Sequence, residues 1–146
     1  MSLTLPTAGN AYQRAQASYG STAASTASPA RLVVMLYDRL LLDLRRAHQF
    51  QVDGEREPAH DNLSHAQEIV AELLSSLDVD AWDGGRQLAS LYQWLMAEMI
   101  RANTRMEPQR VLDCVSVVEP LRDAWAQALE LAGGQEPRGL PVGLTG

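Results

Sequence analysis

The three histidines and the single cysteine of this 146-residue chain are its best candidates for metal binding, group transfer or nucleophilic catalysis. Glu57 and His60 form one Glu-x-x-His motif, the spacing with which di-iron helical bundles hold their metal. Such bundles need two of these motifs and two further inward-facing carboxylates, whereas here one motif stands at a predicted helix start beside Pro58. We therefore interpret the histidines as solvated helix-surface residues and predict no metal site.

The two candidate centres for group transfer are His65 and Cys114. A phosphotransfer bundle would expose one histidine on a helix, but the surroundings of His65, LSHAQ, lack that family's lysine-glycine pair. Cys114 falls within an apolar helical stripe, which is typical of a small core residue. Because nucleophilic catalysis also needs a base and an orienting group, we predict no catalytic residue and no cofactor. A phosphotransfer or metal-binding bundle enzyme is the alternative.

Charge, cysteine content and the length of the apolar runs narrow the classes of partner and the compartment. The chain has a net charge of −6 and its basic side chains are all arginines, scattered along the sequence. Nucleic-acid binders usually present a basic face to the phosphates. The single cysteine precludes an intrachain disulfide, which fits a reducing cytosol, and no apolar run approaches the length of a membrane helix. We expect a cytoplasmic protein that binds neither nucleic acid nor a membrane.

The elements that must position any site are amphipathic helices. Apolar residues recur at helical spacing in four segments, separated by short connections, and no strand pattern competes. This predicts an all-α, antiparallel four-helix bundle. The expected helices span about residues 28–52, 58–77, 86–105 and 107–132, within a bundle domain of residues 28–134.

The helix ends are marked by caps and breakers. Ser28 and the proline after it fit an N-cap and a first helical turn, and Gly54 fits a helix end. The glycine pair at 133–134 predicts the end of the last helix, and Pro120 predicts a kink or a short break near residues 117–119. Residues 1–27 are interpreted as a flexible arm and residues 135–146 as a disordered tail.

Three segments form a recognisable pattern in order and spacing. Residues 26–38 read TASPARLVVMLYD, residues 88–94 read LASLYQW with Arg-Ala-Asn following at 101–103, and residues 121–125 read LRDAW. Together they closely resemble the flagellar secretion chaperone (FliS) family over roughly residues 11–130. Arg39 departs from the pattern, because a glycine is common at that position.

The resemblance implies a cytoplasmic chaperone that binds the C-terminal segment of newly made flagellin. Such a chaperone prevents premature polymerisation and helps to deliver its client to the flagellar export apparatus. The resemblance also implies an N-terminal arm that can cover the binding surface, and neither enzymatic activity nor a cofactor. An adaptor bundle with a different protein client is the alternative, and a second copy of the chain is a further candidate partner.

Partner-binding residues are expected where these segments carry apolar or adaptable side chains. The first helix has more apolar surface than one buried stripe needs, and methionines suit a surface that adapts to its partner. Each methionine could equally fill a gap in the core. The resemblance offers both Tyr12 and Tyr19 as anchors of the arm, and it favours Tyr19, which stands at the distance from the helix start that is usual in the family.

Two of the candidates are expected at the rim of the groove. Tyr92 and Met99 should lose affinity on truncation with a smaller loss of stability, whereas Trp125 is expected in the core. Tyr37 and Tyr92 could each alternatively be core residues whose hydroxyl group is hydrogen-bonded. Asn103 could alternatively cap its helix or form a buried hydrogen bond. The candidate partner-binding residues are Tyr19, Leu32, Met35, Leu36, Tyr37, Leu91, Tyr92, Leu95, Met99 and Asn103.

Overall fold

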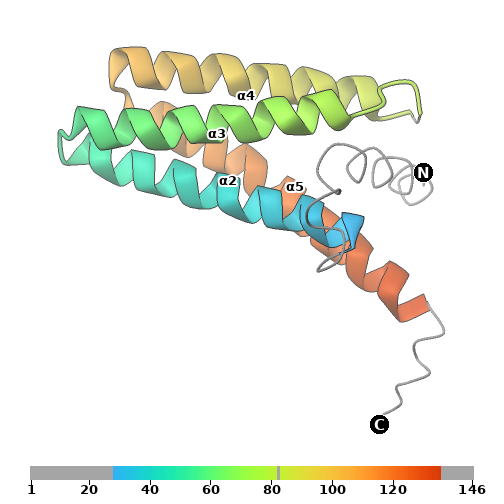
Figure 1. Cartoon of the computed structure of the whole chain (residues 1–146). Coiled ribbons are helices and arrows are strands. Elements are labelled where there is room, and N and C mark those ends of the chain that lie inside the picture. Colours follow the sequence, from blue (N-terminus) through green and yellow to red (C-terminus); the bar gives the residue numbers. More distant parts are fainter. Residues whose placement is uncertain (1–27, 82, 136–146) are drawn as a thin grey trace, which may run out of the picture.

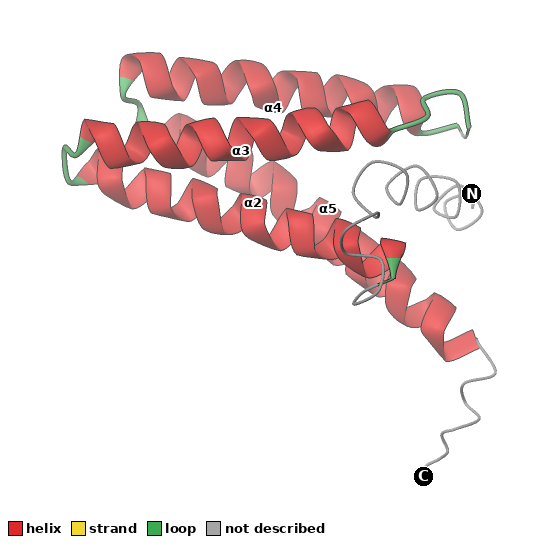
Figure 2. Ribbon diagram, viewed as in Figure 1, coloured by secondary structure: helices red, strands yellow, loops and turns green. Residues whose placement is uncertain are grey.

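The computed structural model describes residues 28–81 and 83–135, and these residues form a helical bundle with no strand among them (Figures 1 and 2). Each helix packs against two others: α2 and α4 both contact α3 and α5. Successive helices run in opposite directions (Figure 1). This confirms the predicted antiparallel four-helix bundle. The helices are α2 (Pro29–Val52), α3 (Arg56–Ser76), α4 (Gly85–Arg105) and α5 (Pro108–Gln135).

The predicted start and end of α2 are confirmed. The Ser28 side chain accepts a hydrogen bond from the backbone N–H of Arg31 at 3.2 Å, and Pro29 occupies the first helical turn. This cap satisfies one of the amide groups that a helix start leaves without an intrahelical partner. After Asp53 the chain turns through Gly54, whose φ of +77° lies in the left-handed region that favours glycine.

The start of α3 differs from its prediction by one half-turn. The helix begins at Arg56 instead of Pro58, so the proline lies inside the first turn. Backbone N–H groups of the first turn have no intrahelical acceptor, and a proline therefore costs no hydrogen bond there.

Two predictions about α5 are wrong, namely a break near residues 117–119 and a helix end at the glycine pair 133–134, whereas the kink at Pro120 stays a prediction. The helix continues through Pro120 without a break, and it continues through Gly133 to Gln135. Pro120 and Ser116, whose carbonyl loses its helical donor to the proline, both lie on the exposed face, where water can satisfy that carbonyl. A helical glycine costs about 1 kcal/mol relative to alanine, which is too little to end the helix by itself.

The core is built from the apolar stripes that the sequence predicted. Leucines from three helices and valines from α5 have no exposed surface, and a methionine and a cysteine complete the centre of the bundle. Trp125 packs against this core but is only partly buried. The fully enclosed side chains include Leu40, Leu44, Leu63, Val70, Leu95, Met99, Val111, Cys114 and Val118.

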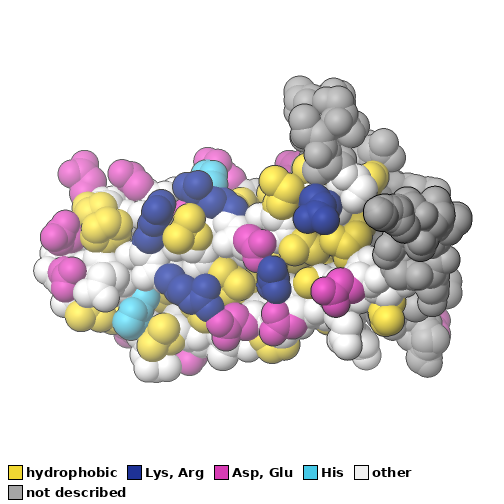
Figure 3. Space-filling view, turned by 90° about the horizontal axis from the view of Figure 1, so that it is seen from below, with side chains coloured by type: hydrophobic (Ala, Val, Ile, Leu, Met, Phe, Trp, Pro, Cys, Tyr) yellow, Lys and Arg dark blue, Asp and Glu magenta, His cyan; other side chains and the backbone are white. Residues whose placement is uncertain are grey.

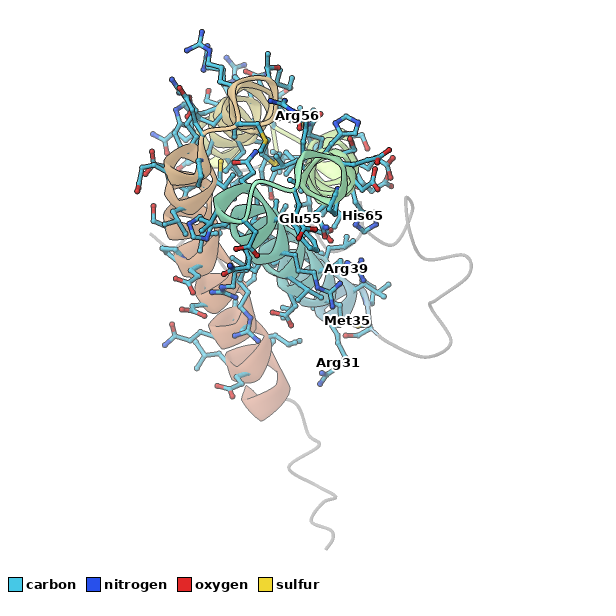
Figure 4. All side chains as sticks on the ribbon, turned by 90° about the vertical axis from the view of Figure 1, so that its left-hand side faces the viewer. Arg31, Met35, Arg39, Glu55, Arg56 and His65 are labelled. Carbon is cyan, nitrogen blue, oxygen red and sulfur yellow. The ribbon has the colours of Figure 1, made fainter. Side chains whose placement is uncertain are left out.

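The two ends of the bundle differ in how the helices meet. At the end that holds the α2–α3 and α4–α5 connections, all of the helices come together (Figure 1). Towards the other end, the C-terminal half of α5 runs beside the N-terminal half of α2 and away from α4 (Figures 1 and 4). None of the helices in the described ranges combines the length and the apolar character needed to cross a membrane.

Candidate functional site

Half of the ten candidate residues from the sequence are part of the core. Leu32, Tyr37, Tyr92, Leu95 and Met99 are buried, because each lies on the side of its helix that faces the other helices. The expected rim positions of Tyr92 and Met99 are therefore wrong: they are 2% and 0% exposed. Leu36, Leu91 and Asn103 are half-buried, Met35 is exposed, and Tyr19 lies outside the described residues.

An aromatic cluster joins three helices inside the bundle. The hydroxyl groups of Tyr37 on α2 and Tyr92 on α4 lie 2.5 Å apart and share a buried hydrogen bond. The ring of Trp125 on α5 packs against Tyr37 with a centroid distance of 6.5 Å and a tilted geometry. Such tilted pairs stabilise a core beyond the area they bury. Tyr37 and Tyr92 belong to two of the three segments that carry the family resemblance. Their hydrogen bond therefore connects α2 to α4 inside the bundle.

Asn103 neither caps α4 nor forms a buried hydrogen bond. The left-handed residue at the end of α4 is Met106, with φ of +52°. The side-chain amide of Asn103 instead donates to Nδ1 of His60 on α3 at 2.7 Å. These two residues line a shallow, open pocket with Arg56 and Glu57. The contact links α3 to α4, and it places the proton of a neutral His60 ring on Nε2.

The side of α4 that faces α5 changes from charged to apolar along its length. Near the α4–α5 connection, buried Glu98 accepts hydrogen bonds from Arg101 and from Arg110 of α5, each at 3.0 Å. Leu91 lies two helical turns before Glu98, and Val117 lies two turns after Arg110. Since i and i+7 share a helix face, Leu91 lies on the face of α4 that carries Glu98, and Val117 lies on the face of α5 that carries Arg110; both are half-buried.

Two further apolar side chains extend this surface. Trp94, one turn before Glu98, is 38% exposed, and Leu121, one turn after Val117, is half-buried against the core. We call Leu91, Trp94, Val117 and Leu121 the α4–α5 apolar seam. Of these residues only Leu91 was a candidate from the sequence. Trp94 could have been identified from the sequence, because it lies one helical turn after Leu91 and at the edge of the buried stripe.

The prediction that the histidines are merely solvated is wrong for His65. Its Nδ1 is hydrogen-bonded to Oδ2 of Asp43, a carboxylate on α2 that is 1% exposed. Arg39 donates from Nε to the other oxygen of Asp43 at 3.2 Å. The pair thus connects α2 to α3, and no serine, threonine or cysteine of the described residues shares a hydrogen bond with His65.

The positions of the histidine, cysteine and carboxylate side chains also bear on metal binding. Across residues 28–81 and 83–135, histidine, cysteine, aspartate and glutamate side chains form no group of three or more that could hold a metal ion. The single Glu-x-x-His motif is spread over the open pocket, where His60 contacts Asn103.

Comparison with known proteins gives the family. The family described as "Flagellar protein FliS" matches residues 10–132. The flagellar secretion chaperone FliS of Bacillus subtilis (strain 168) is 28% identical over 120 residues, which cover 82% of this chain and 90% of the relative. The protein of the same name from Escherichia coli (strain K12) is 32% identical over 110 residues, or 74% of this chain and 81% of the relative.

A third relative agrees with these two. The flagellar secretion chaperone FliS of Salmonella typhimurium (strain LT2) is 30% identical over 120 residues, covering 80% of this chain and 88% of the relative. The match therefore extends over the whole bundle, from before α2 to the last turns of α5. This chain belongs to the FliS family, whose members are flagellar secretion chaperones and not enzymes.

Proposed function

We propose that this protein is a cytoplasmic export chaperone that binds the C-terminal segment of flagellin, prevents its premature polymerisation and aids its delivery to the flagellar export apparatus. The observation that carries this proposal is the family match over residues 10–132, which includes the entire four-helix core. The relatives share the name of flagellar secretion chaperone, and flagellin is the client that the motif resemblance implies.

The α4–α5 apolar seam is the surface that we assign to the client. An amphipathic segment of flagellin, helical when bound, would lay its apolar side along such a row in helix-in-groove fashion. Trp94 supplies a large exposed ring, the type of side chain that most often dominates binding energy. The ion pair between buried Glu98 and half-buried Arg110 ends the row and gives the bound helix a fixed limit.

The buried candidates support this surface from beneath. Tyr92 and Leu95 are neighbours of Leu91 and Trp94 on α4, and their enclosure in the core fixes the position of the helix. Truncating a core residue would therefore weaken binding only by unfolding the bundle. Probes of binding must instead come from the partly exposed positions.

Truncation of the seam should weaken client binding without unfolding the protein. Trp94→Ala is expected to raise the dissociation constant for a purified C-terminal flagellin segment about thirtyfold, the effect of a typical hot-spot residue. Isothermal titration calorimetry measures the affinity, and a strongly negative heat-capacity change should accompany the burial of apolar surface and the ordering of the client. Circular dichroism should show a gain of helix on mixing.

Ile100→Ala is the matched control for this test. Ile100 lies on α4 and is 50% exposed, but it is on a different side of the helix from Leu91 and Trp94. Its truncation should leave the affinity unchanged. An equal loss for both variants would reject the seam, while retaining flagellin as the client. If the folded wild-type protein gives no heat and no gain of helix, the flagellin proposal fails and an adaptor with a different client is left.

A further inference from the structure

The outward face of α2 carries a row of arginines with apolar side chains between them. Arg31, Met35, Arg39, Leu42 and Arg46 follow one another at spacings of three and four, which places them on one helix face. Met35 is 52% exposed and Leu42 is 39% exposed. Figure 4 shows Arg31, Met35 and Arg39 pointing to the same side of α2. We call these five residues the α2 basic stripe.

A buried carboxylate positions the centre of this stripe. Asp43 binds Arg39 through one oxygen and His65 of α3 through the other, so the two side chains lie next to each other at the surface (Figure 4). Only Nε of Arg39 is used in this contact, which leaves both terminal amino groups of the guanidinium to donate outward. A guanidinium held in this way is suited to bind a carboxylate through two hydrogen bonds.

The other two arginines of the stripe form no ion pair with any described residue. Arg31 and Arg46 are exposed, whereas Arg45 on the flank of α2 binds Glu119 and Arg122 binds Asp38. Figure 3 shows arginine, hydrophobic and acidic side chains intermixed on the face of the bundle seen from below. In a chain with a net charge of −6, Arg31 and Arg46 are therefore positive charges without a carboxylate partner among the described residues, on either side of the Arg39–Asp43 pair.

The neighbouring helix restricts what can approach this row. The outward side of α3 is acidic, with Glu57, Asp61, Glu68 and Glu72 one to two turns apart. A broad anionic surface such as a lipid bilayer would meet these carboxylates together with the arginines and would be repelled. A single helix lying along α2 would meet only the arginines. The charge arrangement therefore favours a narrow, acidic partner over a membrane.

We propose that the α2 basic stripe is a docking surface for an acidic amphipathic helix of a partner protein. The carboxylates of the partner helix bind Arg31, Arg39 and Arg46, and the apolar residues of the partner helix cover Met35 and Leu42. The row spans about 22 Å, which corresponds to about four turns of helix. α2 and α4 lie diagonally across the bundle, so this surface is separate from the α4–α5 apolar seam. The proposal does not rest on the identity of the client.

The test titrates the full-length protein with a labelled helical peptide of about four turns, which carries glutamates on both flanks of a leucine row. The same peptide with every glutamate replaced by glutamine is the control ligand. We expect binding of the acidic peptide that weakens with salt, and binding of the control peptide that is at least about tenfold weaker. Arg39→Gln should weaken binding of the acidic peptide about tenfold, because it removes charge-assisted hydrogen bonds.

Arg86→Gln is the matched control variant, since it removes the same charge from an arginine that is exposed on α4. The following results would overturn the proposal. They are equal losses for Arg39→Gln and Arg86→Gln, no binding of the acidic peptide, binding of the wild type to anionic vesicles instead, and self-association that Arg39→Gln abolishes. Competition between the acidic peptide and a flagellin segment would assign the stripe to the client and would also overturn it.

Discussion

Met99→Ala is expected to lower the free energy of unfolding by about 2–5 kcal/mol, the range for truncating a buried methionine, leucine or isoleucine to alanine. Met99 has no exposed surface and lies at the centre of the bundle among Leu95, Val111 and the other core residues. Truncation removes favourable burial and leaves a cavity that the surrounding helices can close only in part. Chemical denaturation followed by circular dichroism measures the change.

The next residue on the same helix is the control. Ile100 is 50% exposed, so Ile100→Ala should change the free energy of unfolding by less than about 1 kcal/mol. A similar small change for Met99→Ala would mean that Met99 lies at the surface in solution, as the sequence had suggested. In that case its role in binding the client would have to be tested directly.

Cys114 is expected to react with iodoacetamide on the order of a thousandfold more slowly in the folded protein than a free thiol does. Burial raises the pKa of the Cys114 thiol from 9.0 to about 12, and the negative charges of Glu98 and Asp113 add to the effect. Because the thiolate is the reactive form, this shift alone lowers the reactive fraction about a thousandfold at pH 8. Mass spectrometry of the alkylated protein follows the reaction.

A cysteine at an exposed site nearby supplies the comparison. Ser116 is exposed on the same helix, so Ser116→Cys in a Cys114→Ala background should be alkylated at close to the rate of a free thiol. Denaturant should make Cys114 equally reactive. Rapid alkylation of Cys114 under native conditions would contradict its enclosure between the helices.

The raised pKa of the Cys114 thiol also predicts how the free energy of unfolding depends on pH. Folding raises the thiol pKa, so the contribution of the neutral thiol is fully present below pH 9 and is lost as the pH rises through about 12.

The sequence was sufficient for the architecture, because local signals determine most of it. The Ser28–Pro29 start, the turn at Gly54 and the four apolar stripes are each readable within a few residues, and the structure confirms them. Pro120 and Gly133 misled the prediction for α5. Their unfavourable effects are local and small, and the packing of a long helix outweighs them.

The candidate site was less predictable, because it depends on contacts between helices. A motif that contains Tyr92 and Trp94 does not reveal which of the two faces inward, since residues two positions apart lie more than half a turn from each other. The contact of Asp43 with His65 joins residues that are 22 positions apart, and neither residue alone signals it. The α4–α5 apolar seam exists only because α5 leaves α4 in its second half, and no local pattern encodes that divergence.

The divergence of α5 has a consequence for where the bundle opens first. Amide hydrogens in a packed helix exchange with solvent through opening events whose free energy depends on how many neighbours must be separated. Near the α4–α5 connection, Glu98 and Arg110 hold the helices together, and opening there requires separation of the whole core. The last turns of α5 contact mainly α2, so they can detach at lower cost. Amide hydrogens in the last turns of α5 are therefore expected to exchange faster than those near the α4–α5 connection.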